Sequence, residues 1–298
     1  MDPAALTRSL THIQANLDGN LSLEALAAVA GCSPPYFARR FAGMMAETPK
    51  RYTSRLRLER AALRLVLLDD GILDIALDCG FSSHETFSRA FRRRFGVSPH
   101  AFRREGRLPT STTPASRTPE QDLPQRVDAA RPVSLSSTVV RGLQPMSLAF
   151  IRHTGPYEQV PIESWDKLID WARRNDIPAP HVLLGIAHDA PGITAPENLR
   201  FDAAIRVPAE FRSGRGEAGA SGGVGHQHLP GGLFALTTSV GPFDSLPAAY
   251  EEVFRRVRSN PSLDCVGLPC IEFYRVNRVA ADLAIVNTEI AVPVRRRR

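Results

Sequence analysis

The sequence predicts a multi-domain chain: an all-α N-terminal domain with two helix-turn-helix units, then an α+β C-terminal domain built from two β-α-β-β units. Three observations support this prediction. Residues 1–107 contain two similar helical segments. Residues 108–133 are rich in proline, serine and threonine and have no apolar period, which is typical of a linker. Residues 134–298 alternate strand patterns with amphipathic helices. A length of 298 residues suits two domains, each with its own core.

The segment 74–104 has the pattern of a helix, a tight turn at Gly80 and a second helix. Apolar residues recur at helical spacing on both sides of the turn. The second helix is expected to begin after a serine N-cap at position 82 or 83 and to end at Phe95. Phenylalanines occupy one face and arginines the other, as in a helix-turn-helix unit whose second helix enters a DNA groove. A helical hairpin with a solvated basic face is the alternative.

A related pattern occurs earlier in the chain. Residues 26–41 and 75–91 both contain a small-residue helix that ends in glycine, a following serine, and the spacing F-x-R-x-F. Two such units in tandem suit a protein that reads two successive major-groove segments about 34 Å apart. Residues 1–107 also contain 16 Lys and Arg against 11 Asp and Glu, a basic balance that suits a nucleic-acid partner.

The string C-G-F-S-S-H-E-T-F-S-R-A-F-R-R-R-F-G-V-S-P-H-A-F-R-R, residues 79–104, resembles the signature of the AraC/XylS family. The resemblance covers about the first hundred residues. It implies seven helices in two helix-turn-helix subdomains, joined by a long central helix that the sequence places at 49–68. It also implies binding to promoter DNA, with recruitment or blocking of RNA polymerase.

The expected DNA-binding residues lie on the two recognition helices and just beyond the second. Base contacts are expected in the first turns, because arginine can pair with guanine, glutamate with cytosine, and threonine with a thymine methyl group. Arginines further along are expected to bind phosphates. The arginines of the central helix have two open interpretations, phosphate contact or a solvated face. The candidates are Tyr36, Ala38, Arg39, Arg40, Ser83, His84, Glu85, Thr86, Arg89, Arg92, Arg93 and Arg103.

Residues 134–298 show one pattern twice: a strand, a Gly-Pro-aromatic turn, an amphipathic helix and two further strands. The first unit is expected at 145–151, 160–175, 182–188 and 201–207. The second unit is expected at 233–240, 245–259, 270–276 and 282–293. Residues 212–225 are rich in glycine and predict a surface loop between the units.

The segments H-T-G-P-Y-E, L-R-F-D-A-A-I-R-V-P and C-I-E-F-Y-R-V resemble the GyrI-like effector-binding domain. Glu272 lies in an otherwise apolar strand, where a carboxylate costs free energy unless it is paired or faces a polar cavity. Tyr274 shares its face by the strand period of two. The resemblance places Glu272 in a ligand pocket. Aromatic side chains that could form its walls and favour a flat or cationic ligand are Tyr157, Trp165, Phe150 and Phe243. The alternative is a glutamate paired with an arginine or exposed at a strand edge.

Other classes of function have less support in the sequence. His226 and His228 have no cysteine or carboxylate at ligand spacing, so we expect no metal and no cofactor. The four cysteines are expected to be reduced, and no segment predicts a membrane span or a signal peptide, which favours the cytoplasm. We therefore expect a transcription regulator controlled by a small hydrophobic or cationic effector, with no catalytic residues. The alternatives are a hydrolase of small electrophiles, with Glu272 as general base, and a protein-interaction module.

Overall fold

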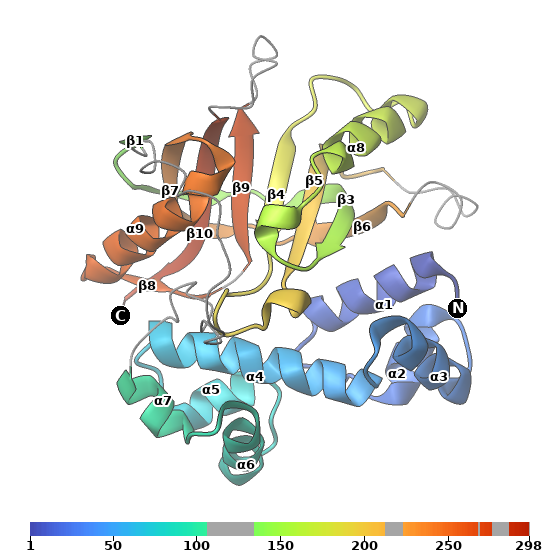
Figure 1. The fold of residues 1–298 in the computed structure, drawn as a ribbon, viewed down its shortest axis with the longest axis vertical. Helices are drawn as coiled ribbons and strands as arrows, with labels where there is room; N and C mark the ends of the chain where they lie inside the picture. Colours follow the sequence, from blue (N-terminus) through green and yellow to red (C-terminus); the bar gives the residue numbers. More distant parts are fainter. Residues whose placement is uncertain (106–133, 212–222, 268, 276–285, 298) are drawn as a thin grey trace, which may run out of the picture.

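The structure is a computed structural model that describes residues 1–105, 134–211, 223–267, 269–275 and 286–297. Helices form the N-terminal domain, and a sheet with two helices forms the C-terminal domain (Figure 1). This architecture confirms the predicted fold class. The expected linker, residues 108–133, and most of the expected loop at 212–225 lie outside the described residues.

The helices of the N-terminal domain follow the predicted order of two helix-turn-helix units around a long central helix. They are α1 (Pro3–Ala15), α2 (Leu23–Ala30), α3 (Pro34–Met45), α4 (Pro49–Leu67), α5 (Ile72–Asp78), α6 (His84–Phe95) and α7 (Pro99–Glu105). Gly31 and Gly80 lie in the turns before the recognition helices α3 and α6, with φ of 69° and 81°. Glycine adopts this left-handed conformation without the strain of a Cβ atom.

The phenylalanines of the repeated pattern fill the cores of the two units. Phe37 and Phe41 of α3, and Phe87 and Phe91 of α6, are 0% exposed. Tyr52 of α4 packs edge-on against Phe41, with ring centroids 5.5 Å apart. Buried aromatic rings on one face fix the rotation of each recognition helix, so the polar residues of α6 point to the solvent.

The C-terminal domain is a curled antiparallel sheet that contains both predicted β-α-β-β units. The first comprises β3 (Met146–Thr154), α8 (Glu163–Arg174), β4 (Leu183–Ala187) and β5 (Arg200–Val207), and the second comprises β7 (Gly232–Gly241), α9 (Leu246–Ser259), β9 (Cys270–Arg275) and β10 (Val286–Arg296). The strand order is β1-β7-β10-β9-β4-β5-β3-β6. Four shorter strands extend the sheet: β1 (Ser134–Leu135), β2 (Val139–Leu143), β6 (Gly225–Leu229) and β8 (Leu263–Cys265).

Helices α8 and α9 pack on the same face of the sheet, over different strands. Helix α8 lies over β3 and β5, and α9 lies over β7, β8 and β10. The central strands β4 and β9 therefore lie between the two helices (Figure 1). The opposite face of the same strands forms a separate apolar core.

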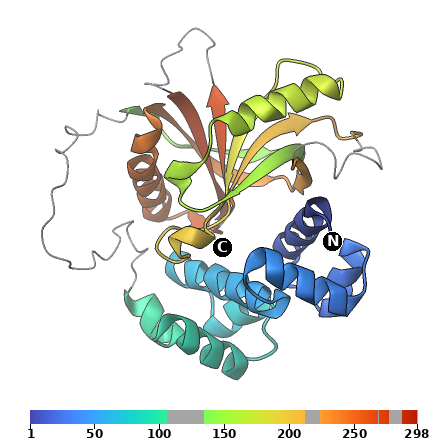
Figure 2. The same ribbon diagram turned by 45° about the vertical axis from the view of Figure 1, so that its right-hand side comes forward.

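The central helix α4 packs against the C-terminal domain as well as against its own helices. One apolar cluster contains Leu58 and Leu63 of α4 together with Val253 of α9 and Val292 of β10. Arg295 adds an ion pair across the same junction, with Nη2 2.6 Å from Asp70 Oδ1. Figure 2 shows α4 between the sheet domain and the helices α5–α7. The two domains therefore share an apolar and ionic interface in which α4 takes part.

Candidate DNA-binding surface and effector site

The exposed face of α6 presents most of the expected DNA-binding residues together. Ser83 caps the helix, because its Oγ accepts a hydrogen bond from the Thr86 backbone N–H at 3.2 Å. The buried phenylalanines hold the opposite face against the core. The exposed residues of α6 are His84, Glu85, Thr86, Arg89, Arg92, Arg93 and Arg94, of which Arg94 donates to Glu59 of α4 at 3.1 Å. Side chains of the types that can read bases and bind phosphates thus share one face of this helix.

Helix α3 presents a smaller polar surface than α6. Arg39 is exposed and Ala38 is half-buried. The Tyr36 hydroxyl contacts the Met1 amino group, and Arg40 donates a hydrogen bond to the Met1 carbonyl oxygen at 3.4 Å. Arg39 is therefore the cationic side chain on this helix that is directed away from such contacts.

Several arginines outside the recognition helices hold the helices together. The Arg103 guanidinium donates to the Asp70 carbonyl oxygen at 2.6 Å. Arg57 donates to the carbonyl oxygens of Leu17 and Gly19 at 2.7 and 2.8 Å, which ties the α1–α2 loop to α4. These contacts satisfy helix-end and loop carbonyls. This contact favours a structural role for Arg103, and its expected contact with phosphate stays a prediction.

Glu272 is buried on β9, between helices α8 and α9. Its side chain accepts hydrogen bonds from the Tyr250 hydroxyl at 2.8 Å and from the Tyr274 hydroxyl. Glu272 is 4% exposed. Burial raises its pKa, although the two tyrosine hydrogen bonds oppose this shift by stabilising the ionised form. Among the described residues its hydrogen-bond partners are thus neutral hydroxyl groups.

Aromatic rings extend from Glu272 in a row of edge-on contacts. The Tyr274 ring lies 5.4 Å from Trp165 and 5.8 Å from Phe243, measured between centroids. Phe201 lies 6.3 Å from Trp165 and 5.7 Å from Tyr157. Of the expected aromatic residues, Tyr274 bonds to Glu272, and Trp165 and Phe243 pack against Tyr274. Tyr157 lies further away and is connected to Trp165 through Phe201.

Phe150 lies apart from this group. It belongs to the apolar core on the opposite face of the sheet, with Leu148 and Leu184. Its strand β3 presents Ala149 and Ile151, not Phe150, to the α8 side. We therefore leave Phe150 out of the candidate site.

Sequence reasoning missed three residues that shape the site. Tyr250 supplies the second hydroxyl to Glu272, and Phe201 connects Trp165 to Tyr157. Gly185 of β4 is the third, because a Cβ atom there would lie less than 3.0 Å from the Tyr274 hydroxyl oxygen and from Phe201 Cζ. The sequence does contain a signal for Tyr250, because a tyrosine on the apolar face of a helix needs a hydrogen-bond partner for its hydroxyl.

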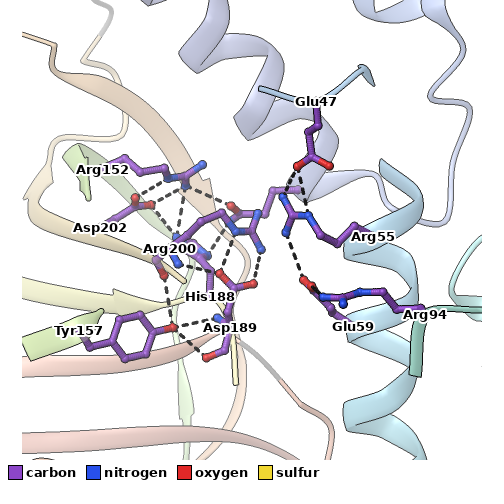
Figure 3. Close-up of polar contacts among 11 residues, drawn as sticks. Glu47, Arg55, Glu59, Arg94, Arg152, Tyr157, His188, Asp189, Arg200 and Asp202 are labelled. Atoms are coloured by element: carbon purple, nitrogen blue, oxygen red, sulfur yellow. Dashed lines mark hydrogen bonds and ion pairs between the residues drawn. The ribbon is translucent and has the colours of Figure 1, made fainter. Parts of the chain in front are cut away.

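A buried polar cluster lies where the C-terminal domain meets the N-terminal helices (Figure 3). Asp202, 0% exposed, accepts from Arg152 Nε at 2.7 Å and lies 2.6 Å from His188 Nε2. Burial opposes ionisation of Asp202, but Arg152 and His188 outweigh it and hold the pKa of this carboxyl well below its usual range. Burial lowers the pKa of His188, against the opposing effect of Asp202. These two directions favour a neutral imidazole beside an ionised carboxylate.

No helix within the described ranges is both long and apolar enough to cross a membrane. The described residues also contain no group of three or more His, Cys, Asp or Glu side chains arranged to hold a metal ion. All four cysteines are free thiols in the structure.

Comparisons with known proteins agree with this geometry. Residues 138–295 match the family described as a GyrI-like small molecule binding domain, and residues 26–105 match the family described as a helix-turn-helix domain. The Right origin-binding protein of Escherichia coli (strain K12) is 38% identical over 105 residues, which are 35% of this chain and 36% of that protein. Regulatory protein SoxS of the same organism is 36% identical over 94 residues, which are 32% of this chain and 88% of SoxS.

A part of the chain also matches a solved structure. A transcriptional regulator with an AraC-type DNA-binding domain from Chromobacterium violaceum is 32% identical, and the match covers 34% of this chain and 91% of that one at a TM-score of 0.33. The matched region spans about a third of the length of the first curated relatives, 30% and 36%. The chain therefore belongs to the AraC-type helix-turn-helix family and has a GyrI-like small molecule binding domain as its C-terminal half.

Proposed function

We propose that the chain is a DNA-binding transcription regulator controlled by a small hydrophobic or cationic molecule that binds beside Glu272. DNA binding is assigned to residues 1–107 and effector binding to residues 134–298, joined by the linker at 108–133. The observation that supports effector binding is a buried carboxylate whose described hydrogen-bond partners are the neutral hydroxyls of Tyr250 and Tyr274. A buried carboxylate is stabilised by a cation, and aromatic rings attract cations through their faces.

DNA binding is supported by the exposed face of α6. Arg89, Arg92 and Arg93 are exposed on this face. In this proposal Arg89 pairs with guanine, and Arg92 and Arg93 bind phosphates. RNA polymerase is the proposed protein partner, since a regulator bound at a promoter acts on transcription through the polymerase. Selection of duplexes from a random library on the full chain tests this part. We expect two short preferred elements about 10–10.5 base pairs apart, one for each helix-turn-helix unit.

The effector site is tested with a pair of probes of one shape and opposite charge. Tetraphenylphosphonium is a hydrophobic cation, and tetraphenylborate is the matching anion. Trp165 and Trp171 are the two tryptophans of the chain. Trp165 contacts Tyr274, whereas Trp171 lies in the apolar core between α8 and the sheet. In a chain with Trp171→Phe, fluorescence therefore comes from Trp165 and reports binding beside it. Glu272→Gln keeps the size of the side chain and removes its charge.

We expect the cation to quench Trp165 at lower concentration than the anion does. Glu272→Gln should weaken cation binding by about tenfold and abolish this preference, since a tenfold change corresponds to about 1.4 kcal/mol. Equal binding of the two probes, or an unchanged preference in Glu272→Gln, contradicts a site that recognises positive charge.

The raised pKa of Glu272 favours a second candidate, hydrolysis of a small electrophilic compound with this carboxylate as general base. Depletion of an epoxide by the full chain, but not by Glu272→Gln, would support hydrolysis. A regulator that only binds leaves the epoxide unchanged in both cases.

A further inference from the structure

One dipeptide, His188–Asp189, contacts both the effector site and the DNA-binding domain. The Tyr157 hydroxyl donates to the Asp189 carbonyl oxygen at 2.8 Å and lies 3.1 Å from the Asp189 backbone N–H donor. The neighbouring residue, His188, has Nδ1 2.7 Å from Nε2 of Gln14 on α1. Figure 3 shows Tyr157 on one side of this dipeptide and the polar cluster on the other. The His188–Gln14 contact therefore joins the two domains, and the Tyr157–Asp189 contact, within the C-terminal domain, joins the same dipeptide to the aromatic rings.

The contact with Gln14 depends on one orientation of its amide. Arg152 Nη2 donates to Gln14 Oε1 at 3.1 Å, so the amide NH₂ group faces His188. Asp202 lies 2.6 Å from His188 Nε2 and accepts that N–H. Nδ1 is then the acceptor for Gln14. A shift of His188 breaks its hydrogen bond to Gln14. Neither side chain can restore this bond by rotating, because Arg152 holds the Gln14 amide and Asp202 holds the His188 ring.

A ligand beside Glu272 acts on this dipeptide through the aromatic rings. The rings of Tyr274, Trp165, Phe201 and Tyr157 follow one another at centroid distances of 5.4, 6.3 and 5.7 Å. A cation at Glu272 takes the place of a tyrosine hydroxyl and displaces rings in this row. Tyr157 is the last ring, and its hydroxyl holds Asp189.

Helix α1 transmits a displacement to the first helix-turn-helix unit. Its residues Leu10 and Ile13 are buried in one cluster with Phe37 and Phe41 of α3. Packed cores move as units rather than deform continuously. Movement of α1 therefore moves α3 relative to α6, and the distance between these helices sets the spacing of the two DNA elements.

We propose that His188–Asp189 couples effector binding to DNA binding, and that Gln14 is the positioning residue that receives the signal. This inference rests on the proposed function. Its measure is a coupling factor: the ratio of the Kd for a library-selected duplex without and with saturating tetraphenylphosphonium. Effector coupling is typically 5- to 150-fold, in either direction.

The test compares the full wild-type chain with Gln14→Met, which keeps the length of the side chain and removes both hydrogen bonds. We expect the wild-type factor to differ from 1 by about fivefold or more. In Gln14→Met the factor should fall within about twofold of 1, while each Kd measured alone stays within about threefold of wild type. A purely structural role for Gln14 would change the separate affinities and leave their ratio unchanged, and that result would overturn the proposal.

Arg295→Ala is the matched control, because it breaks an interdomain contact with Asp70 at 2.6 Å without touching His188–Asp189. Its coupling factor should stay at the wild-type value. An equal loss of coupling in Arg295→Ala and Gln14→Met would overturn the assignment, since the whole interface would then be responsible.

A second experiment tests the same coupling without tetraphenylphosphonium. Tyr157→Phe removes only the hydroxyl that holds Asp189, so it should change the Kd for DNA in the wild-type background and leave it unchanged in the Gln14→Met background. Equal changes in both backgrounds would overturn the coupling. If tetraphenylphosphonium fails to quench Trp165, the proposed effector class fails, and this second experiment still decides the coupling separately.

Discussion

Gly185→Ala tests whether the aromatic rings beside Glu272 are as closely packed as the structure shows. The new Cβ atom would lie less than 3.0 Å from the Tyr274 hydroxyl oxygen and from Phe201 Cζ, and 3.1 Å from Tyr274 Cζ. Overpacking of this kind costs about 1–3 kcal/mol. Displacement of Tyr274 also weakens its hydrogen bond to Glu272. We therefore expect a loss of about 2 kcal/mol, which lowers Tm by roughly 4–8 °C in a domain of this size.

The assay is thermal unfolding followed by tryptophan fluorescence, since Trp165 and Trp171 both lie in the C-terminal domain. Gly142→Ala on β2 is the control, because the nearest atom to its new Cβ is the Gly232 carbonyl oxygen at 4.0 Å. This substitution should leave Tm unchanged or raise it slightly, because Gly→Ala at a compatible position adds up to about 0.4–1 kcal/mol to the free energy of unfolding. Equal Tm shifts in the two variants would refute the packing argument.

Further predictions concern pH and DNA. The affinity for tetraphenylphosphonium should rise as pH rises through the raised pKa of Glu272, since only the ionised carboxylate attracts the cation. An affinity, measured by Trp165 quenching, that does not rise with pH above the ordinary range of a glutamate would contradict this. Arg89→Ala should weaken binding to the selected duplex by about 1–3 kcal/mol, measured by fluorescence anisotropy. Arg103→Ala should lower Tm by removing the bond to the Asp70 carbonyl, with little change in the salt dependence of DNA binding, whereas a phosphate contact would flatten that dependence.

The N-terminal domain was predictable because its signals are local in the sequence. Ser83 and Gly80 mark the ends of neighbouring helices, and the spacing of Phe87 and Phe91 fixes the buried face of α6. In the sheet, the strands with strong apolar patterns were predicted. Strand β2 is mostly exposed and β6 contains His-Gln-His, so neither has the apolar alternation that predicts a half-buried strand.

The candidate site was predictable only in part. Glu272 is an anomaly in its own strand, and Tyr274 follows from the period of two. The position of Phe150 on the opposite face depends on how β3 pairs with its neighbours, which the sequence of one strand does not determine. The pairing of Arg295 with Asp70 was equally inaccessible, because it joins residues 225 positions apart through tertiary packing.

If this chain binds DNA and a small molecule at coupled sites, each ligand must change the affinity for the other. The Kd for the selected duplex is measured with and without saturating tetraphenylphosphonium, and the Kd for tetraphenylphosphonium is measured with and without saturating duplex, all on the full wild-type chain. Linkage requires the same factor in both experiments, and we expect it to be about fivefold or more. Two affinities that are each independent of the other ligand would mean that the two sites are not coupled.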